Sequence, residues 1–271
     1  MKKILAMLLA LVLCFSMVAC GGSAEEPEES AAPETETAAP AEGEETAEPA
    51  EGEEAEEPAE GEEAAPAVMS YEEFVAAPID SEVTVETYVQ AKQGWWEDKA
   101  TVYTADEDGA YFLYELPCTE AEYETLVEGQ KIRVTGFKAE WSGEVEIIDA
   151  TWELLEGDSY VAEPVDVTEL LGTDALAEKM NQKVSFKGMT VASEAMYKYD
   201  GSGELGDDLY FDVTLGDKTY TFTVESYLCG ADTEVYKAVD ELKVGDVVDM
   251  EGFLYWYEGA NPHITAVAAA E

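Results

Sequence analysis

Apolar and polar residues alternate along 83–89, where valine and tyrosine are interleaved with threonine and glutamate. A period of two is typical of a strand with one buried face. Residues 184–191 form a comparable apolar, β-branched segment about 100 residues later. Each of these strands is followed by two further predicted strands, at 98–104 and 110–116 in the first half and at 208–215 and 219–226 in the second. The chain therefore repeats one order of elements.

A short amphipathic segment follows the third strand of each half, at 119–128 and 231–242. The first begins with Thr119 and places Glu122 three residues later, a pattern that predicts a helix with a capping box. Two more strands follow each helix, so the predicted order in each half is three strands, one helix and two strands.

Part of this duplication is visible without gaps, because residues 129–150 align with 245–266 at a constant offset, with six of 22 positions identical. The identities include glycines after the helix, inside a strand and in the next hairpin: Gly129/Gly245, Gly136/Gly252 and Gly143/Gly259. The first pair predicts a positive φ at the helix end. The second predicts a bulge or sharp coil, and the third a hairpin turn.

This element order resembles the OB-fold, a five-stranded Greek-key barrel. The resemblance covers two predicted domains, residues 69–157 and 166–271. It rests on element order, glycine positions and the duplication, and it predicts a mainly β protein with two tandem OB-like barrels, each with one short helix. A β-sandwich is the alternative, and the single helix between strands three and four in both halves argues against it.

The first 20 residues resemble a bacterial lipoprotein signal peptide. Lys2 and Lys3 precede an apolar run from Ile4 to Val18, and the segment ends in Met17-Val18-Ala19-Cys20. Met17 departs from the usual leucine of the lipobox. The resemblance implies that residues 1–19 are removed, that Cys20 is lipidated, and that the protein is extracytoplasmic and anchored to the cell membrane. The alternative is an ordinary secretory signal with a chance cysteine. A transmembrane anchor is disfavoured, because about 15 apolar residues fall short of the ~20 that span a membrane.

A low-complexity segment comes next, and residues 20–68 form a predicted linker. Residues 21–66 hold 18 Glu and six Pro, with no Lys, Arg or aromatic residue. Such a composition cannot bury enough apolar surface to offset the entropy of ordering, so we expect a disordered spacer. An acidic cation-binding tail is the competing interpretation.

Charge narrows the choice of partners. The chain has 62 acidic and 14 basic residues, and 44 acidic and 12 basic residues remain after position 66. A surface this negative repels phosphate backbones, so the sequence predicts no nucleic-acid partner despite the fold. It suits solubility, cationic partners or divalent ions.

OB-folds bind ligands on strands two and three and on the adjacent loops. Aromatic residues recur at both loop positions in both halves, beside carboxylates, and flat aromatic faces with nearby acceptors suit sugars, extended peptides or cations. The candidate contact residues are Trp95, Trp96, Trp141, Tyr197, Tyr199 and Trp256. The competing interpretation is that these side chains are core or ordinary exposed strand residues.

Two acidic, glycine-bearing loops are weak candidates for Ca²⁺, through Asp106 and Asp108 in one and Asp200 and Asp207 in the other. Neither has EF-hand spacing, and plain hairpin turns explain such loops more simply. No cofactor is therefore expected.

Catalytic signals are absent from the sequence. Cys118 and Cys229 are predicted to be small buried residues rather than a disulfide. His263, the single histidine, aligns with Ile147 in the duplication and has no nucleophile motif beside it. The sequence thus predicts a membrane-anchored, non-enzymatic binding module for a cell-wall glycan or peptide. The alternatives are a structural or accessory protein that binds another envelope protein and, third, a carboxylate-based hydrolase.

Overall fold

A computed structural model describes residues 67–270, which lie within one compact unit, Glu62–Glu271. The predicted signal peptide, the predicted lipidation site Cys20 and almost all of the predicted linker lie outside the described residues.

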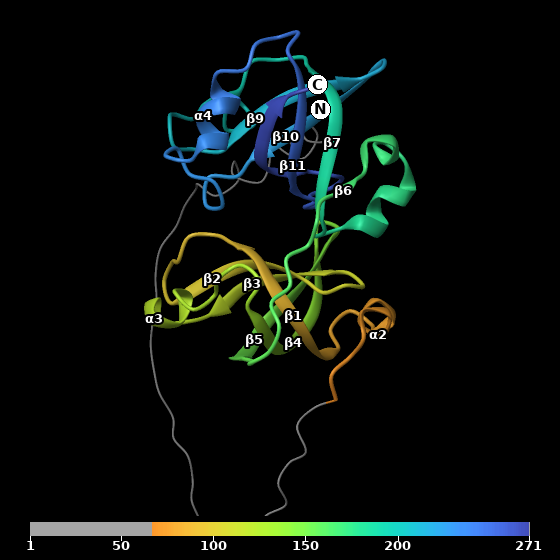
Figure 1. The fold of residues 1–271 in the computed structure, drawn as a ribbon, viewed down its shortest axis with the longest axis vertical. Helices are drawn as coiled ribbons and strands as arrows, with labels where there is room; N and C mark the ends of the chain where they lie inside the picture. The colour runs from red at the N-terminus through yellow and green to blue at the C-terminus, as the bar shows by residue number, and fades with distance from the viewer. Residues whose placement is uncertain (1–66, 271) are drawn as a thin grey trace, which may run out of the picture. The chain divides into compact units, whose positions relative to one another are not determined.

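Five strands form the first barrel: β1 (Glu82–Lys92), β2 (Lys99–Ala105), β3 (Ala110–Pro117), β4 (Lys131–Trp141) and β5 (Glu144–Leu154). They close in the order β1-β2-β3-β5-β4 (Figure 1). Strands β3 and β5 pair in parallel, whereas the other pairs are antiparallel.

The second barrel repeats this order with β7 (Lys183–Val191), β9 (Leu209–Leu215), β10 (Lys218–Val224), β11 (Val247–Phe253) and β12 (His263–Ala269). Strand β7 pairs with both β9 and β11, which closes the barrel, and β10 pairs in parallel with β12. Two short strands, β6 (Val165–Asp166) and β8 (Met196–Tyr197), extend it. The protein is mainly β with two OB-like barrels, as predicted, and it is not a sandwich.

Short helices occupy the predicted places, α3 (Glu120–Tyr123) in the first barrel and α4 (Glu234–Asp240) in the second. The capping box of Thr119 and Glu122 is confirmed. Both helices are shorter than predicted. After α3 the chain tightens into turns, because Leu126 is drawn into the core, where it is 1% exposed, and its neighbours Thr125 and Val127 are β-branched.

Five elements were not predicted: the short strands β6 and β8, the helix α2 (Tyr71–Ala76) and the 3₁₀ helices η1 (Thr168–Leu170) and η2 (Asp174–Lys179). Helix α2 begins with a capping box between Ser70 and Glu73. Among the described residues, no helix has the length and apolarity needed to cross a membrane.

The backbone conformations predicted for the glycines are confirmed, although Gly129 and Gly245 lie in turns after α3 and α4 and not at the helix ends. Gly129 and Gly245 have φ values of 82° and 96°. The pairing register shifts at Gly136 and Gly252, so both strands bulge there. A side chain at Gly252 would meet the carbonyl of His263, and one at Gly136 would lie 2.7 Å from the carbonyl oxygen of Ile148. The bulge therefore depends on close backbone approach.

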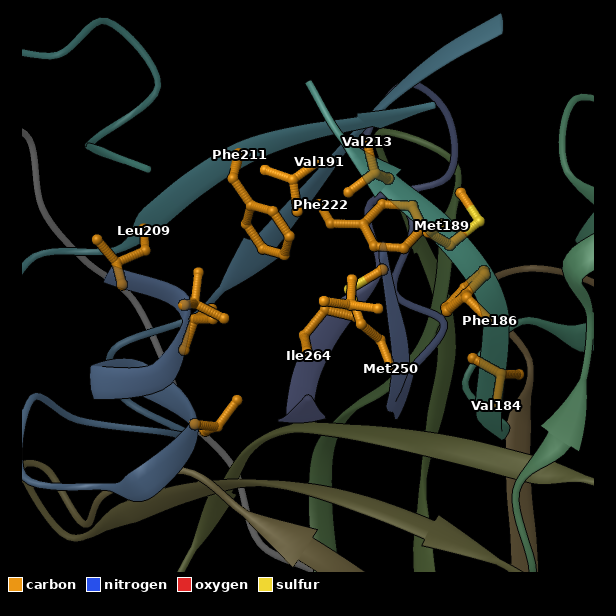
Figure 2. Packing of buried hydrophobic residues seen from close by; sticks show 14 of the residues in the cluster. Val184, Phe186, Met189, Val191, Leu209, Phe211, Val213, Phe222, Met250 and Ile264 are labelled. Carbon is orange, nitrogen blue, oxygen red and sulfur yellow. The ribbon is translucent and has the colours of Figure 1, made fainter. Parts of the chain in front are cut away.

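Each barrel has its own core. In the second, Phe186, Phe211 and Phe222 meet inside the sheet, and Met250 and Ile264 fill the space beside them (Figure 2). The first barrel buries an equivalent aliphatic cluster around Val85, Val102, Leu113, Ile132 and Val134.

The gapless alignment of the duplication is wrong in its last strand. Phe137 of the first barrel pairs with Ile148, whereas its counterpart Phe253 in the second barrel pairs with His263. His263 thus takes the place of Ile148 rather than of Ile147. The reason is that the β4–β5 hairpin, between Phe137 and Ile148, is one residue longer than the β11–β12 hairpin, between Phe253 and His263. A gapless alignment cannot include this difference.

Candidate functional site

The outer face of β2 and β3 in the first barrel, where OB-folds bind ligands, is divided into two parts. One part is covered by the second barrel. Tyr103 is fully buried and stacks on Phe253 with ring centroids 4.4 Å apart, and Phe112 packs against Tyr255 at 5.4 Å. The Tyr103 hydroxyl lies 3.0 Å from Nδ1 of His263. This half of the face is an interface between barrels and not a ligand surface.

The other half remains open and forms a pocket of about 320 Å³. Three aromatic side chains line it from three different segments: Trp96 before β2, Tyr114 on β3, and Tyr227 from the second barrel. They are 67%, 44% and 67% exposed. Exposed aromatic side chains that converge on one hollow are a typical feature of a binding site.

A tight turn fixes the position of Trp96. The backbone N–H groups of Trp96 and Lys99 donate to each other's carbonyls at 3.0 and 2.9 Å, and Glu97 and Asp98 between them have positive φ values of 46° and 59°. Two central residues with positive φ are typical of a type I′ hairpin turn. The turn holds the Trp96 ring at the pocket without support from the core.

Trp95 lies on the opposite side of the chain. Its indole N–H donates to the Cys118 carbonyl at 2.9 Å, and its ring packs against the core of the first barrel. Neighbouring residues in extended backbone point to opposite sides, which explains why only one of the two tryptophans is available to a ligand.

Polar groups complete the pocket. Lys99 Nζ and Glu115 Oε2 form an ion pair at 2.6 Å, and both side chains are nearly half exposed. Glu115 lies in a bulge of β3 with φ of 49°, and its N–H donates to the Thr101 hydroxyl at 3.3 Å. The Glu115 carboxylate raises the pKa of Lys99. The pocket therefore offers an ammonium donor and a carboxylate acceptor beside aromatic faces.

The second barrel closes one side of the pocket. The Gly94 N–H donates to the Tyr227 carbonyl at 2.8 Å. The loop that carries Tyr227 is held by Glu225, whose carboxylate accepts from the N–H groups of Tyr227 and Leu228 at 3.2 and 2.8 Å. Burial, with a contribution from Asp208, raises the pKa of Glu225 to about 7.

The remaining predicted contact residues lie elsewhere. Tyr197 and Trp256 are half-buried against the core of the second barrel. The Tyr197 hydroxyl donates to Asp240 at 2.8 Å. Trp141 and Tyr199 are exposed, at 52% and 78%, on a surface outside the pocket. Of the six predicted residues, only Trp96 lines the pocket.

Four pocket residues with charged or aromatic side chains were not predicted: Lys99, Tyr114, Glu115 and Tyr227. The first three lie on β2 and β3, the strands that carry ligands in OB-folds, so their strand positions were an available signal. Tyr227 comes from the second barrel, and no pattern in the sequence connects it to β2.

Three of the four weak metal candidates, Asp106, Asp200 and Asp207, cap turns with their carboxylates. Asp106 accepts from the backbone N–H groups of Asp108 and Gly109 at 2.9 and 2.8 Å. Asp200 accepts from the Ser202 N–H, and Asp207 accepts from the Glu204 N–H, both at 3.0 Å. Within residues 67–270, no group of three or more His, Cys, Asp or Glu side chains is placed to hold a metal ion.

The two cysteines and the histidine of the described residues are buried. Cys118 and Cys229 are free thiols, as predicted, and burial raises the pKa of Cys229 to about 11. His263 is 5% exposed, and burial lowers its pKa to about 3, so its imidazole is neutral.

No family model matches this chain, and no curated protein matches it. Similar solved structures include a murine DNA-binding protein bound to double-stranded DNA, with 11% identity, 69% of this chain and 96% of that chain covered, and a TM-score of 0.35. Another is the Ifi202 HINa domain in complex with 20-bp double-stranded DNA, with 12% identity, coverage of 70% and 100%, and a TM-score of 0.31. A third is the single-stranded DNA-binding protein of Thermus aquaticus, with 17% identity, coverage of 70% and 94%, and a TM-score of 0.25.

These structures correct one prediction. The prediction of no nucleic-acid partner rested on net charge alone. It is wrong, because these similar structures are described as DNA-binding proteins. None of the three is described as an enzyme. At these TM-scores the likeness does not assign a function to this chain.

Proposed function

We propose that this protein is a lipid-anchored, non-enzymatic binding module that holds a glycan or glycopeptide in the pocket of Trp96, Tyr114 and Tyr227. The observation that carries the proposal is the convergence of three exposed aromatic side chains on one hollow beside the Lys99–Glu115 ion pair. Sugar rings present apolar C–H faces to aromatic rings and hydroxyls to charged donors and acceptors, so this combination suits them.

The proposal also places the protein in the cell, on the basis of its N-terminal sequence. A lipid on Cys20 would hold the chain at the membrane, and the glutamate-rich segment 21–66 would act as a spacer. The barrels would then present the pocket to the cell wall or the extracellular space.

Tryptophan fluorescence of the full chain, titrated with soluble cell-wall glycopeptides, tests the proposal. Trp96→Ala should weaken binding at least tenfold, which corresponds to about 1.4 kcal/mol. Trp141→Ala is the matched control, because it removes another exposed tryptophan outside the pocket. Both variants should keep the wild-type melting temperature.

Three results would contradict the proposal. They are no saturable response in the wild type, equal binding by wild type and Trp96→Ala, or tighter binding of an oligonucleotide such as dT12 than of any glycopeptide.

A further inference from the structure

A second aromatic surface lies outside the pocket. We call it the aromatic stripe, and it consists of Trp141, Tyr257, Tyr210 and Tyr199. The ring centroids of Trp141 and Tyr257 are 5.2 Å apart, and those of Tyr199 and Tyr210 are 6.5 Å apart. Tyr257 and Tyr210 connect the two pairs, because Tyr210 pairs across the sheet with Thr223, whose hydroxyl donates at 2.8 Å to Oδ1 of Asn261 in the hairpin that carries Tyr257.

Three of the four rings are largely exposed: Trp141 at 52%, Tyr257 at 49% and Tyr199 at 78%. Tyr210 is half-buried on the outer face of β9, because its strand neighbours Leu209 and Phe211 point into the core. Four aromatic side chains in a row contribute little to the core, so their common exposure requires another explanation.

The backbone holds the stripe in place. The Glu258 N–H donates to the Ser142 carbonyl at 2.7 Å, which ties the hairpin of Tyr257 to that of Trp141. Tyr199 follows Lys198, whose φ is 58°, in a loop closed by the bond between Lys198 N–H and the Asp208 carbonyl at 2.8 Å. A ligand would therefore meet rings that are already ordered, which lowers the entropic cost of binding.

The charges beside the stripe are negative. Asp208 lies two residues before Tyr210, and its Oδ1 accepts from the N–H and the hydroxyl of Ser226 at 2.8 and 2.7 Å. Asp212 lies two residues from Tyr210 on the same face of β9. The basic side chain in this loop, Lys198, is already paired with Asp207 at 3.3 Å. Aromatic faces with adjacent carboxylates select cations, and arginine in particular, because guanidinium groups stack on rings and pair with carboxylates.

We propose that the aromatic stripe is a docking surface for an extended, arginine-bearing peptide segment of a partner protein. Alternate residues of an extended chain are about 6.6–6.8 Å apart on one face. This spacing is close to the ring separations within each pair of the stripe, 5.2 and 6.5 Å, so that alternate arginines can lie over successive rings.

The test uses a fluorescein-labelled (Arg-Ser)4 peptide and the full chain, with fluorescence anisotropy at 0.15 M salt. The strong net negative charge of the protein attracts any cationic peptide, so the variants must leave charge unchanged. Tyr199→Ala/Tyr257→Ala removes two exposed rings of the stripe, and Trp96→Ala/Tyr227→Ala removes two exposed rings of the pocket.

We expect the stripe variant to bind at least tenfold more weakly and the pocket variant to bind like the wild type. Wild-type affinity in the stripe variant, or an equal loss in both variants, would mean that only overall charge attracts the peptide and would overturn the proposal. Should the double variant melt at a lower temperature, Tyr199→Ala alone gives the same comparison, because its 78% exposed side chain contributes little to folding.

Discussion

Replacing Glu144 by glutamine should stabilise the protein at neutral and alkaline pH and have little effect near pH 5. Glu144 begins β5, is 0% exposed, and lies between the barrels, where Oε2 accepts from the Trp256 N–H at 2.8 Å. Its other oxygen, Oε1, has no hydrogen-bond partner, and neither does the buried Oδ1 of Asn181. The Asn181 side chain lies beside Glu144, where it opposes part of the rise in the pKa of Glu144, and its amide N–H donates to the Val145 carbonyl at 3.1 Å. A proton on Oε1 of Glu144 would allow this oxygen to donate a hydrogen bond to Oδ1 of Asn181.

Burial is the main cause that raises the pKa of Glu144 from 4.5 to about 8, and Glu146 adds to it. At pH 7 the carboxyl is therefore neutral in the folded protein and ionised in the unfolded chain. The folded state binds more protons between these two pKa values, so the free energy of unfolding falls as pH rises from 4.5 to 8. At 1.36 kcal/mol per pKa unit, the loss is below about 1 kcal/mol at pH 5, about 3 at pH 7 and about 5 at pH 9.

Glutamine has the same shape and remains neutral at every pH. Its amide can donate to Asn181 and accept from Trp256, so Glu144→Gln should retain the stability of the protonated form. The gain over wild type should therefore follow the loss above, reaching about 3 kcal/mol at pH 7. Burial also raises the pKa values of Glu146 and Glu225 to about 7, but both groups remain in the variant, so the effect of their own burial cancels in the comparison.

Urea denaturation of the full chain at pH 5, 7 and 9, followed by tryptophan fluorescence, measures this gain. Glu163→Gln is the control, because it makes the same change at an exposed glutamate, and it should differ little from wild type. A gain that does not depend on pH, or a loss at pH 7, would refute the reasoning. Either result would mean that Glu144 is ionised in the folded protein and stabilised by the surrounding dipoles.

Two further predictions concern backbone support. Lys138 is 6% exposed, and its ammonium donates to the carbonyls of Phe74, Val75 and Ala77 at 2.8–2.9 Å, so Lys138→Met should cost roughly 2–3 kcal/mol and speed amide hydrogen exchange in α2. Unchanged exchange would show that α2 does not depend on this side chain. Gly252→Ala should cost about 1–3 kcal/mol in urea denaturation, because its methyl group would meet the His263 carbonyl. Gly230→Ala is its control, since that methyl group would have no neighbour closer than 3.4 Å; equal effects of the two changes would contradict the close approach.

The sequence determined the strands, their order and the positions of the bulges. Strand identity is local information, because a residue's neighbours two positions away decide which face is apolar. The duplication then supplied the topology, since one order of elements found twice predicted the same barrel twice. The glycines at 129, 136 and 143, with their counterparts 116 residues later, marked positions where the backbone needs positive φ or close approach.

The tertiary structure decided which outward-facing residues are accessible. Tyr103 and Tyr114 both lie on the outer part of the β2–β3 sheet, yet Tyr103 is fully buried by Phe253 while Tyr114 lines the pocket. Alternation along a strand separates the inside of a barrel from its outside, but it contains no information on what covers the outside. Tyr227 reaches the pocket from a barrel more than 100 residues away in the chain, through the packing of one barrel on the other. The chain's own pattern therefore built the two barrels, and their contact divided the aromatic residues among core, interface and open surface.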